Sequence, residues 1–373
     1  ALLRAYARYM KQIRFGFSEA FIADTMCKYP EITSFIIQYF QTRFGLENMT
    51  LESRNHRLEQ LDEQLPERLD AVESINEDRI YRRYHELMKA TLRTNFFQNC
   101  EDNELKRYFS FKLSPQQITD IPLPKPMFEI FVYSPRVEGV HLRGGKVARG
   151  GLRWSDRNED FRTEVLGLVK AQQVKNSVIV PVGAKGGFVA KQLPENDRDA
   201  FMAEGIACYK TFISALLDVT DNLLEGKVIP PEQVVRHDED DPYLVVAADK
   251  GTATFSDISN GIAQERGFWL GDAFASGGSV GYDHKKMGIT AKGAWVSVQR
   301  HFRERGINVQ EESITAIGVG DMAGDVFGNG MLRSEYIKLV AAFNHLHIFI
   351  DPNPEDVKAN YQERLRLFEM PRS

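Results

Sequence analysis

The chain has 373 residues, of which 43% are hydrophobic and 27% charged, and its formal net charge is −5. This composition is that of a globular protein of two or three domains, and the negative charge disfavours a nucleic-acid partner. Three widely separated cysteines argue against a disulfide framework and a zinc site, so we expect a reducing, cytoplasmic setting and no metal. No apolar run reaches about 18 residues, which predicts no membrane span. The chain starts without Met inside a helical pattern, so we expect a piece of a longer protein.

Residues 1–104 have the periodicity of helices. Four leucines recur at spacings of three, four and four, as one face of a helix requires: Leu58, Leu61, Leu65 and Leu69. Pro66 falls inside this run and predicts a kink or a restart of the helix. The leucines could form a heptad arm or a packing layer, and we favour the packing layer.

From residue 105 onward the patterns of strands and helices alternate. Short aromatic or valine-rich runs predict strands at 108–113, 128–133 and 137–143, and buried apolar runs predict strands at 177–182 and 241–251. Helical patterns cover 160–175 and 197–224, the second ended by Gly226. Residues 230–241 carry an acidic run that we interpret as a solvated surface loop rather than a metal site. The alternation predicts an α/β fold with a mixed sheet flanked by helices.

The last part of the chain contains a strand, a glycine turn and a helix start. The run SITAIGVGDMAG, 313–324, holds a GxGxxA pattern that would bind a dinucleotide through Gly318, Gly320, Asp321, Met322 and Ala323. We interpret HLHIFID, 345–351, as the next strand, whose final Asp351 would bind the adenosine ribose and favour NAD over NADP. The alternative is an ordinary connection without a ligand. Asp321 would lie near the pyrophosphate unless its side chain points away.

One lysine, Lys185, stands among glycines in the run VPVGAKGGFVAK, 180–191. Glycines remove side chains that would block a ligand. An amine held by apolar strands loses solvation, which disfavours its charged form and suits it to act as a base. Lys185 is therefore a candidate catalytic residue, which could act as a base or polarise a carbonyl.

Further charged residues accompany this lysine. Arg149 precedes the pair Gly150 and Gly151, and Lys175 lies ten residues before Lys185. Two cations and an amine would suit a substrate with two carboxylates. The alternative is a basic surface that happens to contain glycine. No GxxxxGK[ST] occurs, which disfavours a P-loop hydrolase.

Asp249 follows the apolar run YLVVAA, where α/β proteins bind ligands at the carboxyl end of a strand. The alternative is a helix cap, but Ser256 and Asp257 are better placed to cap the next helix.

Four segments resemble the glutamate dehydrogenases, and most closely their large-subunit, NAD-specific bacterial branch: ARGGLRW, QQVKNSVIVPVGAKGG, VVAADKG and AIGVGDMAGDVFGNGML. They occur in the family's order, and the resemblance covers about residues 110–373. It implies a helical connecting region at 1–104, a substrate domain at 105–285, and a Rossmann-type NAD domain at 286–373 that is incomplete at its end.

The resemblance also implies a role for each matching residue. Lys185 corresponds to the catalytic lysine and Asp249 to the proton-transferring aspartate. The other correspondences are Gln172 and Lys175 at the substrate α-carboxylate, Arg149 at a substrate carboxylate, Lys286 near the substrate, and Thr290 at the nicotinamide amide. Arg149 departs from the lysine of smaller members, and the segment from Lys175 to Lys185 is about two residues shorter than theirs.

The implied reaction is the oxidative deamination of L-glutamate to 2-oxoglutarate and ammonia with hydride transfer to NAD, in a cytoplasmic homo-oligomer. A leucine- or phenylalanine-type dehydrogenase is a second interpretation, but the surplus cations Arg149 and Lys286 favour glutamate. A non-catalytic module that binds NAD or an amino acid is a third, and the presence of both Lys185 and Asp249 argues against it.

Overall fold

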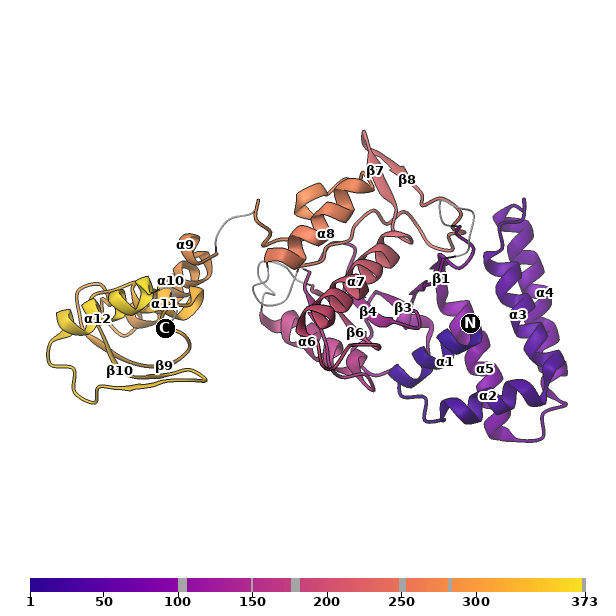
Figure 1. Ribbon diagram of the computed structural model, residues 1–373, viewed down its shortest axis with the longest axis horizontal. Coiled ribbons are helices and arrows are strands. Elements are labelled where there is room, and N and C mark those ends of the chain that lie inside the picture. The colour runs from indigo at the N-terminus through magenta and orange to yellow at the C-terminus, as the bar shows by residue number, and fades with distance from the viewer. Residues whose placement is uncertain (100–105, 149, 176–181, 248–252, 281–283, 371–373) are drawn as a thin grey trace. The chain divides into compact units, whose positions relative to one another are not determined.

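A computed structural model describes residues 1–99, 106–148, 150–175, 182–247, 253–280 and 284–370, with the backbone alone at 174, 175, 253 and 284. The chain divides into two compact units, Ala1–Ser279 and Val280–Ser373, and each is described by itself (Figure 1).

Five helices open the first unit: α1 (Leu2–Gln12), α2 (Glu19–Lys28), α3 (Pro30–Phe44), α4 (Leu51–Leu69) and α5 (Ile75–Ala90). The four leucines of α4 are all buried, which confirms the packing layer. Helix α4 continues through Pro66 to Leu69, so the predicted restart does not occur.

A six-stranded mixed sheet follows, in the order β1-β2-β3-β4-β6-β5. Its strands are β1 (Thr91–Thr94), β2 (Phe109–Leu113), β3 (Phe128–Tyr133), β4 (Val137–Arg143), β5 (Leu152–Trp154) and β6 (Ala184–Ala190). Neighbours are antiparallel except β5 and β6, which are parallel. The predicted strands at 108–113, 128–133 and 137–143 are confirmed, and so is the α/β class with a mixed sheet.

Helices cover both faces of this sheet. Side chains of a strand alternate between faces, so Phe131 packs into a core with α1–α5 and α6 (Phe161–Lys175). Its neighbours Ile130 and Val132 pack into a second core with α7 (Arg198–Leu217) and α8 (Ala253–Glu265). The helical region and the sheet thus share one core, and residue 104 is not a limit between compact units.

The helix predicted at 197–224 is shorter than expected. Helix α7 ends at Leu217, and a hairpin follows, β7 (Asn222–Leu224) and β8 (Lys227–Ile229). Glu225 and Gly226 have φ of 50° and 78°, as a two-residue hairpin turn requires. By length and composition α7 could cross a membrane, and 44% of its apolar 18-residue window is buried inside the protein. Two 3₁₀ turns complete the unit, Pro115–Gln117 and Gly271–Ala273.

The acidic run in 230–241 is not simply a solvated loop, so that prediction is wrong for two of its members. Asp238 accepts from Arg93 Nε and Lys112 Nζ, both at 2.6 Å. Asp241 accepts from Lys112 at 2.7 Å and also from Arg143. Carboxylates removed from water are stable only when paired in this way. These ion pairs hold the acidic segment against strands β1, β2 and β4.

Two histidines, the buried His141 and the half-buried His237, make the stability of this unit sensitive to acid. Burial, reinforced by Arg43, lowers the pKa of His237 to about 4, and burial with Arg143 does the same for His141. The unfolded chain takes up these protons near pH 6.5 and the folded chain only near pH 4. Each histidine therefore contributes stability above pH 6.5 that is lost as the pH falls to 4.

We expect His237→Gln to remove part of this acid sensitivity. A lowered pKa of this size corresponds to about 2 kcal/mol of unfolding free energy between pH 7 and pH 5, as an upper figure. The glutamine amide can still donate to the Arg43 carbonyl, which His237 Nε2 contacts at 2.9 Å. Urea unfolding at the two pH values measures the difference, and an unchanged pH dependence in the variant would contradict it.

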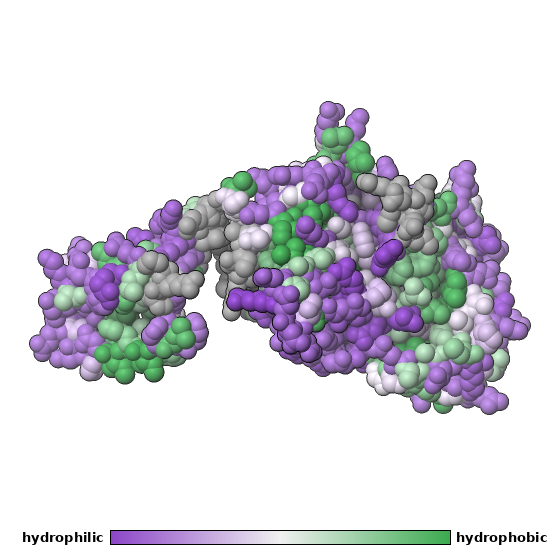
Figure 2. Space-filling view, viewed as in Figure 1, coloured by the Kyte–Doolittle hydropathy of each residue, from purple (hydrophilic) through white to green (hydrophobic). Residues whose placement is uncertain are grey.

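The second unit contains a three-stranded sheet in the order β11-β10-β9. Its elements are α9 (His284–Met287), α10 (Ile289–Arg303), β9 (Ile314–Val319), α11 (Asp325–Met331), β10 (Ile337–Phe343), β11 (Ile348–Ile350) and α12 (Val357–Glu369). Strands β9 and β10 are parallel, so β9, α11 and β10 form the predicted strand–helix–strand unit. One face of β9 is apolar and exposed at Ile317 and Val319, and apolar surface is visible over this part of the unit (Figure 2).

The second parallel strand is not the predicted one. It is β10, whereas β11, within the predicted 345–351, runs antiparallel to β10. Asp351 N–H donates to the Val340 carbonyl at 2.8 Å, so Asp351 lies beside the middle of β10. Asn344 follows the carboxyl end of β10 instead. Asp351 therefore does not end the second parallel strand, which is the position that its predicted contact with the ribose required.

Candidate functional site

Lys185 is the second residue of strand β6 and lies opposite Leu142 of β4. The sequence predicted this lysine after the end of a strand at 177–182, of which 177–181 lie outside the described residues. Lys185 is instead near the start of a strand and is half-buried. Strand β6 is hydrogen-bonded to β4 on one side and to β5 on the other, which fixes the backbone of Lys185 in place.

The glycines around Lys185 make room for the protein's own side chains rather than for a ligand, contrary to expectation. A Cβ at Gly183 would lie 2.7 Å from Gln172 Cδ, and one at Gly187 would lie 2.6 Å from Val165 Cγ2. A Cβ at Gly186 would overlap Leu152. These glycines let helix α6 and strand β5 approach β6 closely.

The side chain of Lys185 lies across Gly151. A Cβ on Gly151 would overlap Lys185 Nζ and would be 2.9 Å from both Cδ and Cε. The Gly151 carbonyl accepts from Gly186 N–H at 2.7 Å, which ties the two segments together. A Cβ on Gly150 would lie 2.7 Å from the Val245 carbonyl oxygen. The structure thus brings together Lys185, Gly150 and Gly151.

Gln172 on helix α6 joins this group. Its side chain is buried against Gly183, two residues before Lys185. Among the described residues its Oε1 has no hydrogen-bond partner. A buried amide oxygen without a donor is costly, so this position fits a group that donates to it.

Three predicted site residues are not placed. Arg149 and Asp249 lie outside the described residues, and Lys175 is described only as the last backbone position of α6. Their neighbours are placed: Leu152 N–H donates to the Ala247 carbonyl at 2.5 Å. The chain that leads to Asp249 therefore runs beside the chain that follows Arg149.

The predicted strand at 241–251 is not assigned as a strand over 241–247. Its alternate carbonyls at Tyr243, Val245 and Ala247 nevertheless accept hydrogen bonds, from the Arg143 guanidinium, His141 Nε2 at 3.3 Å, and Leu152 N–H. Two of the three donors are side chains. The segment is buried at Asp241, Leu244 and Val246 and partly exposed between them, and it lacks a full backbone ladder.

In the second unit, the glycine turn packs closely on its helix. A Cβ on Gly318 would lie 2.6 Å from Phe327 Cζ, and one on Gly320 would lie 2.6 Å from Phe327 Cβ. Asp321 Oδ1 accepts from Ala323 N–H at 2.9 Å, so its carboxylate faces its own turn. Met322 is buried. The close helix–strand contact is the one that glycines provide in dinucleotide folds.

A cavity of about 520 Å³ lies beside this turn. It is lined by Val319, Gly320 and Asp321 on one side and by Trp295 of α10 on the other. Trp295 Nε1 is buried and has no hydrogen-bond partner among the described residues. Lys286 of α9 and Thr290, the second residue of α10, are exposed and do not line the cavity.

Comparison with known proteins decides the family. Residues 64–373 match the family described as "Bacterial NAD-glutamate dehydrogenase, catalytic domain", and residues 1–46 match "Glutamate dehydrogenase, helical motif 3". The chain belongs to the bacterial NAD-glutamate dehydrogenase family.

Curated relatives agree with this membership. The chain is 68% identical to the NAD-specific glutamate dehydrogenase of Pseudomonas aeruginosa and 56% identical to that of Mycobacterium tuberculosis, with 100% of the chain covered in each case. It spans 23% of the length of each relative. A solved glutamate dehydrogenase of Peptoniphilus asaccharolyticus has a TM-score of 0.43 at 14% identity, over 70% of this chain and 59% of that one.

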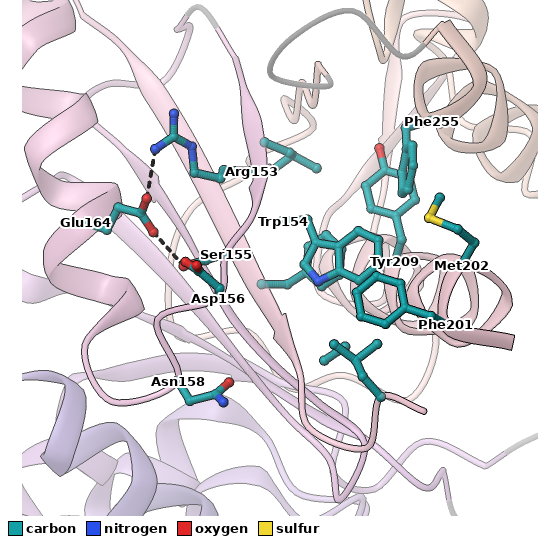
Figure 3. A pocket seen from close by; sticks show the side chains of 14 residues that line it. Arg153, Trp154, Ser155, Asp156, Asn158, Glu164, Phe201, Met202, Tyr209 and Phe255 are labelled. Atoms are coloured by element: carbon teal, nitrogen blue, oxygen red, sulfur yellow. Dashed lines mark hydrogen bonds and ion pairs between the residues drawn. The ribbon is translucent and has the colours of Figure 1, made fainter. Parts of the chain in front are cut away.

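This family member also has a cavity of about 830 Å³ that the sequence did not predict. Aromatic side chains line it; Trp154 stacks with Phe201 (Figure 3) and also with Phe188. Arg153 and Ser155 both donate to Glu164 at its edge, at 2.8 and 2.5 Å. Lys185 does not line this cavity, so the predicted catalytic group lies elsewhere on the first unit.

Sequence reasoning missed three residues that hold the main chain near Gly150, namely His141, Arg143 and Tyr243. A signal was present, because His141 and Arg143 stand two apart on a strand and therefore share a face. Two polar side chains on one face of a buried strand indicate a polar partner, which here is the main chain at 243–245.

Proposed function

We propose that the full-length protein converts L-glutamate, water and NAD to 2-oxoglutarate, ammonia and NADH. Membership of the family and the names of its relatives support this proposal. The observation that carries it is the Lys185 amine lying across Gly151. Contact with the Gly151 backbone holds the amine in one place, as a reacting group requires.

In this proposal the two substrate carboxylates bind to Arg149 and to Lys175 with Gln172, and Lys286 adds a cation near the substrate. Charge-assisted hydrogen bonds of this kind hold a flexible diacid in one orientation. An apolar amino acid needs only one such site, which is why we propose glutamate over leucine or phenylalanine.

The chemistry divides between Asp249 and Lys185. Asp249 accepts one proton from the substrate ammonium, which leaves a neutral amine able to form a C=N bond as hydride departs from Cα. Lys185 assists the attack of water on the resulting imine carbon and stabilises the charge that develops. The C–N bond then breaks, and the proton held by Asp249 goes to the departing ammonia.

NAD, when bound, accepts the hydride from Cα. The parallel strand–turn–helix–strand of the second unit and the cavity beside its turn fit a dinucleotide. We propose that Gly318, Gly320, Met322 and Ala323 hold it through the main chain. Thr290 would contact the nicotinamide amide. Asp321 faces its own turn, and Asp351 lies beside the middle of β10, so neither carboxylate is proposed as a ribose ligand.

We expect the full-length protein to form NADH from L-glutamate and NAD, with far slower rates on leucine and phenylalanine and with NADP. Absorbance of NADH over a panel of amino acids measures this. Turnover of leucine but not of glutamate would support the second type of dehydrogenase instead. Binding of glutamate by calorimetry without any NADH would support a non-catalytic module.

We also infer from the resemblance that the full-length protein is a cytoplasmic homo-oligomer. Light scattering on the purified protein tests the oligomer, and a monomer at micromolar concentration would contradict it.

A further inference from the structure

We propose that Tyr243 is a positioning residue, which together with His141 and Arg143 holds the Gly150–Gly151 main chain beneath Lys185. The inference rests on the proposed function, since it assigns these side chains a part in the reaction of Lys185. None of the three touches the Lys185 amine in the described contacts, so they act through the main chain.

The hydroxyl of Tyr243 forms the link between the two segments that carry the site. It donates to the Ala148 carbonyl at 2.8 Å, two residues before Gly150. Two residues further along each segment, the Val245 carbonyl lies against Gly150, and a Cβ on Gly150 would be 2.7 Å from the Val245 carbonyl oxygen. Leu152 N–H then donates to the Ala247 carbonyl at 2.5 Å. The segment 243–247 thus contacts Ala148, Gly150 and Leu152.

Strand β4 fixes the other edge of 243–247. His141 Nε2 contacts the Val245 carbonyl at 3.3 Å, and the Arg143 guanidinium donates to the Tyr243 carbonyl. Burial and the neighbouring Arg143 lower the pKa of His141 to about 4, so the ring is neutral at pH 7 and its Nε2–H can donate. Two side chains two residues apart on β4 therefore hold two carbonyls two residues apart.

Arg143 is itself held in place by an ion pair with the buried Asp241. Its guanidinium also donates to Asp241, which accepts from Lys112 Nζ at 2.7 Å. The backbone N–H of Asp241 donates to Asp221 Oδ2 at 2.7 Å. Burial by itself raises the pKa of Asp241, but Lys112 and Arg143 outweigh it and keep the carboxyl ionised. Paired buried charges with several hydrogen bonds have little freedom to move.

The consequence for Lys185 follows from its contact with Gly151. Because the lysine stem lies on the Gly151 backbone, a shift of that backbone displaces the amine. A misplacement of about 1 Å can cost about a hundredfold in rate. Loss of one hydrogen bond gives a smaller shift, and we expect about a tenfold loss in kcat/KM.

The test is Tyr243→Phe in the full-length protein, which removes only the hydroxyl. The matched control is Tyr84→Phe. Tyr84 lies in helix α5, and its hydroxyl also donates to a main-chain carbonyl, that of Leu3, at 2.8 Å. We expect Tyr243→Phe to lower kcat/KM for glutamate about tenfold while the KM for NAD stays unchanged. Tyr84→Phe should change neither parameter, and both variants should lose a similar amount of thermal stability.

Amide hydrogen exchange separates failure of this inference from failure of the proposed function. If the wild-type protein forms no NADH, the function fails, yet exchange still reports whether the hydroxyl holds the backbone. We expect the amides of Gly150 to Leu152 to exchange faster in Tyr243→Phe and at the wild-type rate in Tyr84→Phe. Unchanged exchange in Tyr243→Phe, or kinetics equal to those of Tyr84→Phe in an active enzyme, would overturn the inference.

Discussion

Lys185→Ala in the full-length protein is expected to lose about 10²- to 10⁴-fold in turnover, the range over which a positioned proton-transfer group contributes. Glutamate should still bind, because the proposed carboxylate contacts come from other residues. The loss should therefore appear in kcat rather than in KM. Initial rates of NADH formation over a range of glutamate concentrations measure both.

Lys227→Ala is the control for this variant. Lys227 lies in strand β8 and is exposed, so its loss should leave both constants unchanged. Near-normal turnover by Lys185→Ala would remove Lys185 from the chemistry, whatever the control shows.

Gly151→Ala is the second variant with a large expected effect. The new methyl group would overlap Lys185 Nζ and lie 2.9 Å from Cδ and Cε, so the lysine side chain must leave its position. We expect kcat/KM for glutamate to fall about a hundredfold or more, as displacement of a reacting group implies. The folded state should survive, because the far end of a lysine side chain can move.

Gly167→Ala provides a matched control. Gly167 lies within helix α6, and a Cβ there meets nothing within 4 Å. This variant should keep full activity and gain about 0.5–1 kcal/mol of stability from better helix propensity. If Gly151→Ala is as active as Gly167→Ala, the contact between Lys185 and Gly151 has no part in catalysis.

The sequence predicted features that depend on local pattern. The leucines of α4 are buried at the helical spacing, and the three strands at 108–143 follow from short aromatic or valine-rich runs that end in Ser-Pro or Gly-Gly. The sequence assigned Lys185 and Gly151 to one candidate site, and in the structure the lysine side chain lies against Gly151.

Features that depend on distant partners could not be predicted in this way. Asp238 is half-buried and paired because Arg93 and Lys112 reach it from β1 and β2, at separations of 145 and 126 residues. Within its own segment, Asp238 is one of several consecutive acids and looks solvated. The hydrogen bonds of Tyr243, His141 and Arg143 are likewise invisible until β4 and 243–247 lie side by side.

Two boundaries were predicted wrongly because one sequence pattern is compatible with two structures. They are the end of the helix predicted at 197–224 and the end of the second parallel strand. A glycine such as Gly226 can end a helix or occupy a hairpin turn, because both positions need a positive φ. The sequence predicted a helix end, but Gly226 lies in the turn between β7 and β8. Two apolar runs, 337–343 and 348–350, both suit a strand. The first pairs parallel to β9 and the second antiparallel to β10, so the acid after the second does not end the parallel strand.

The most direct test of the central claim is a crystal structure of the full-length protein soaked with 2-oxoglutarate. We predict that the diacid lies above Gly151 with its carbonyl oxygen about 3 Å from Lys185 Nζ. A diacid bound with Lys185 out of its reach, or a Lys185 side chain turned away from Gly151 in that complex, would contradict the account.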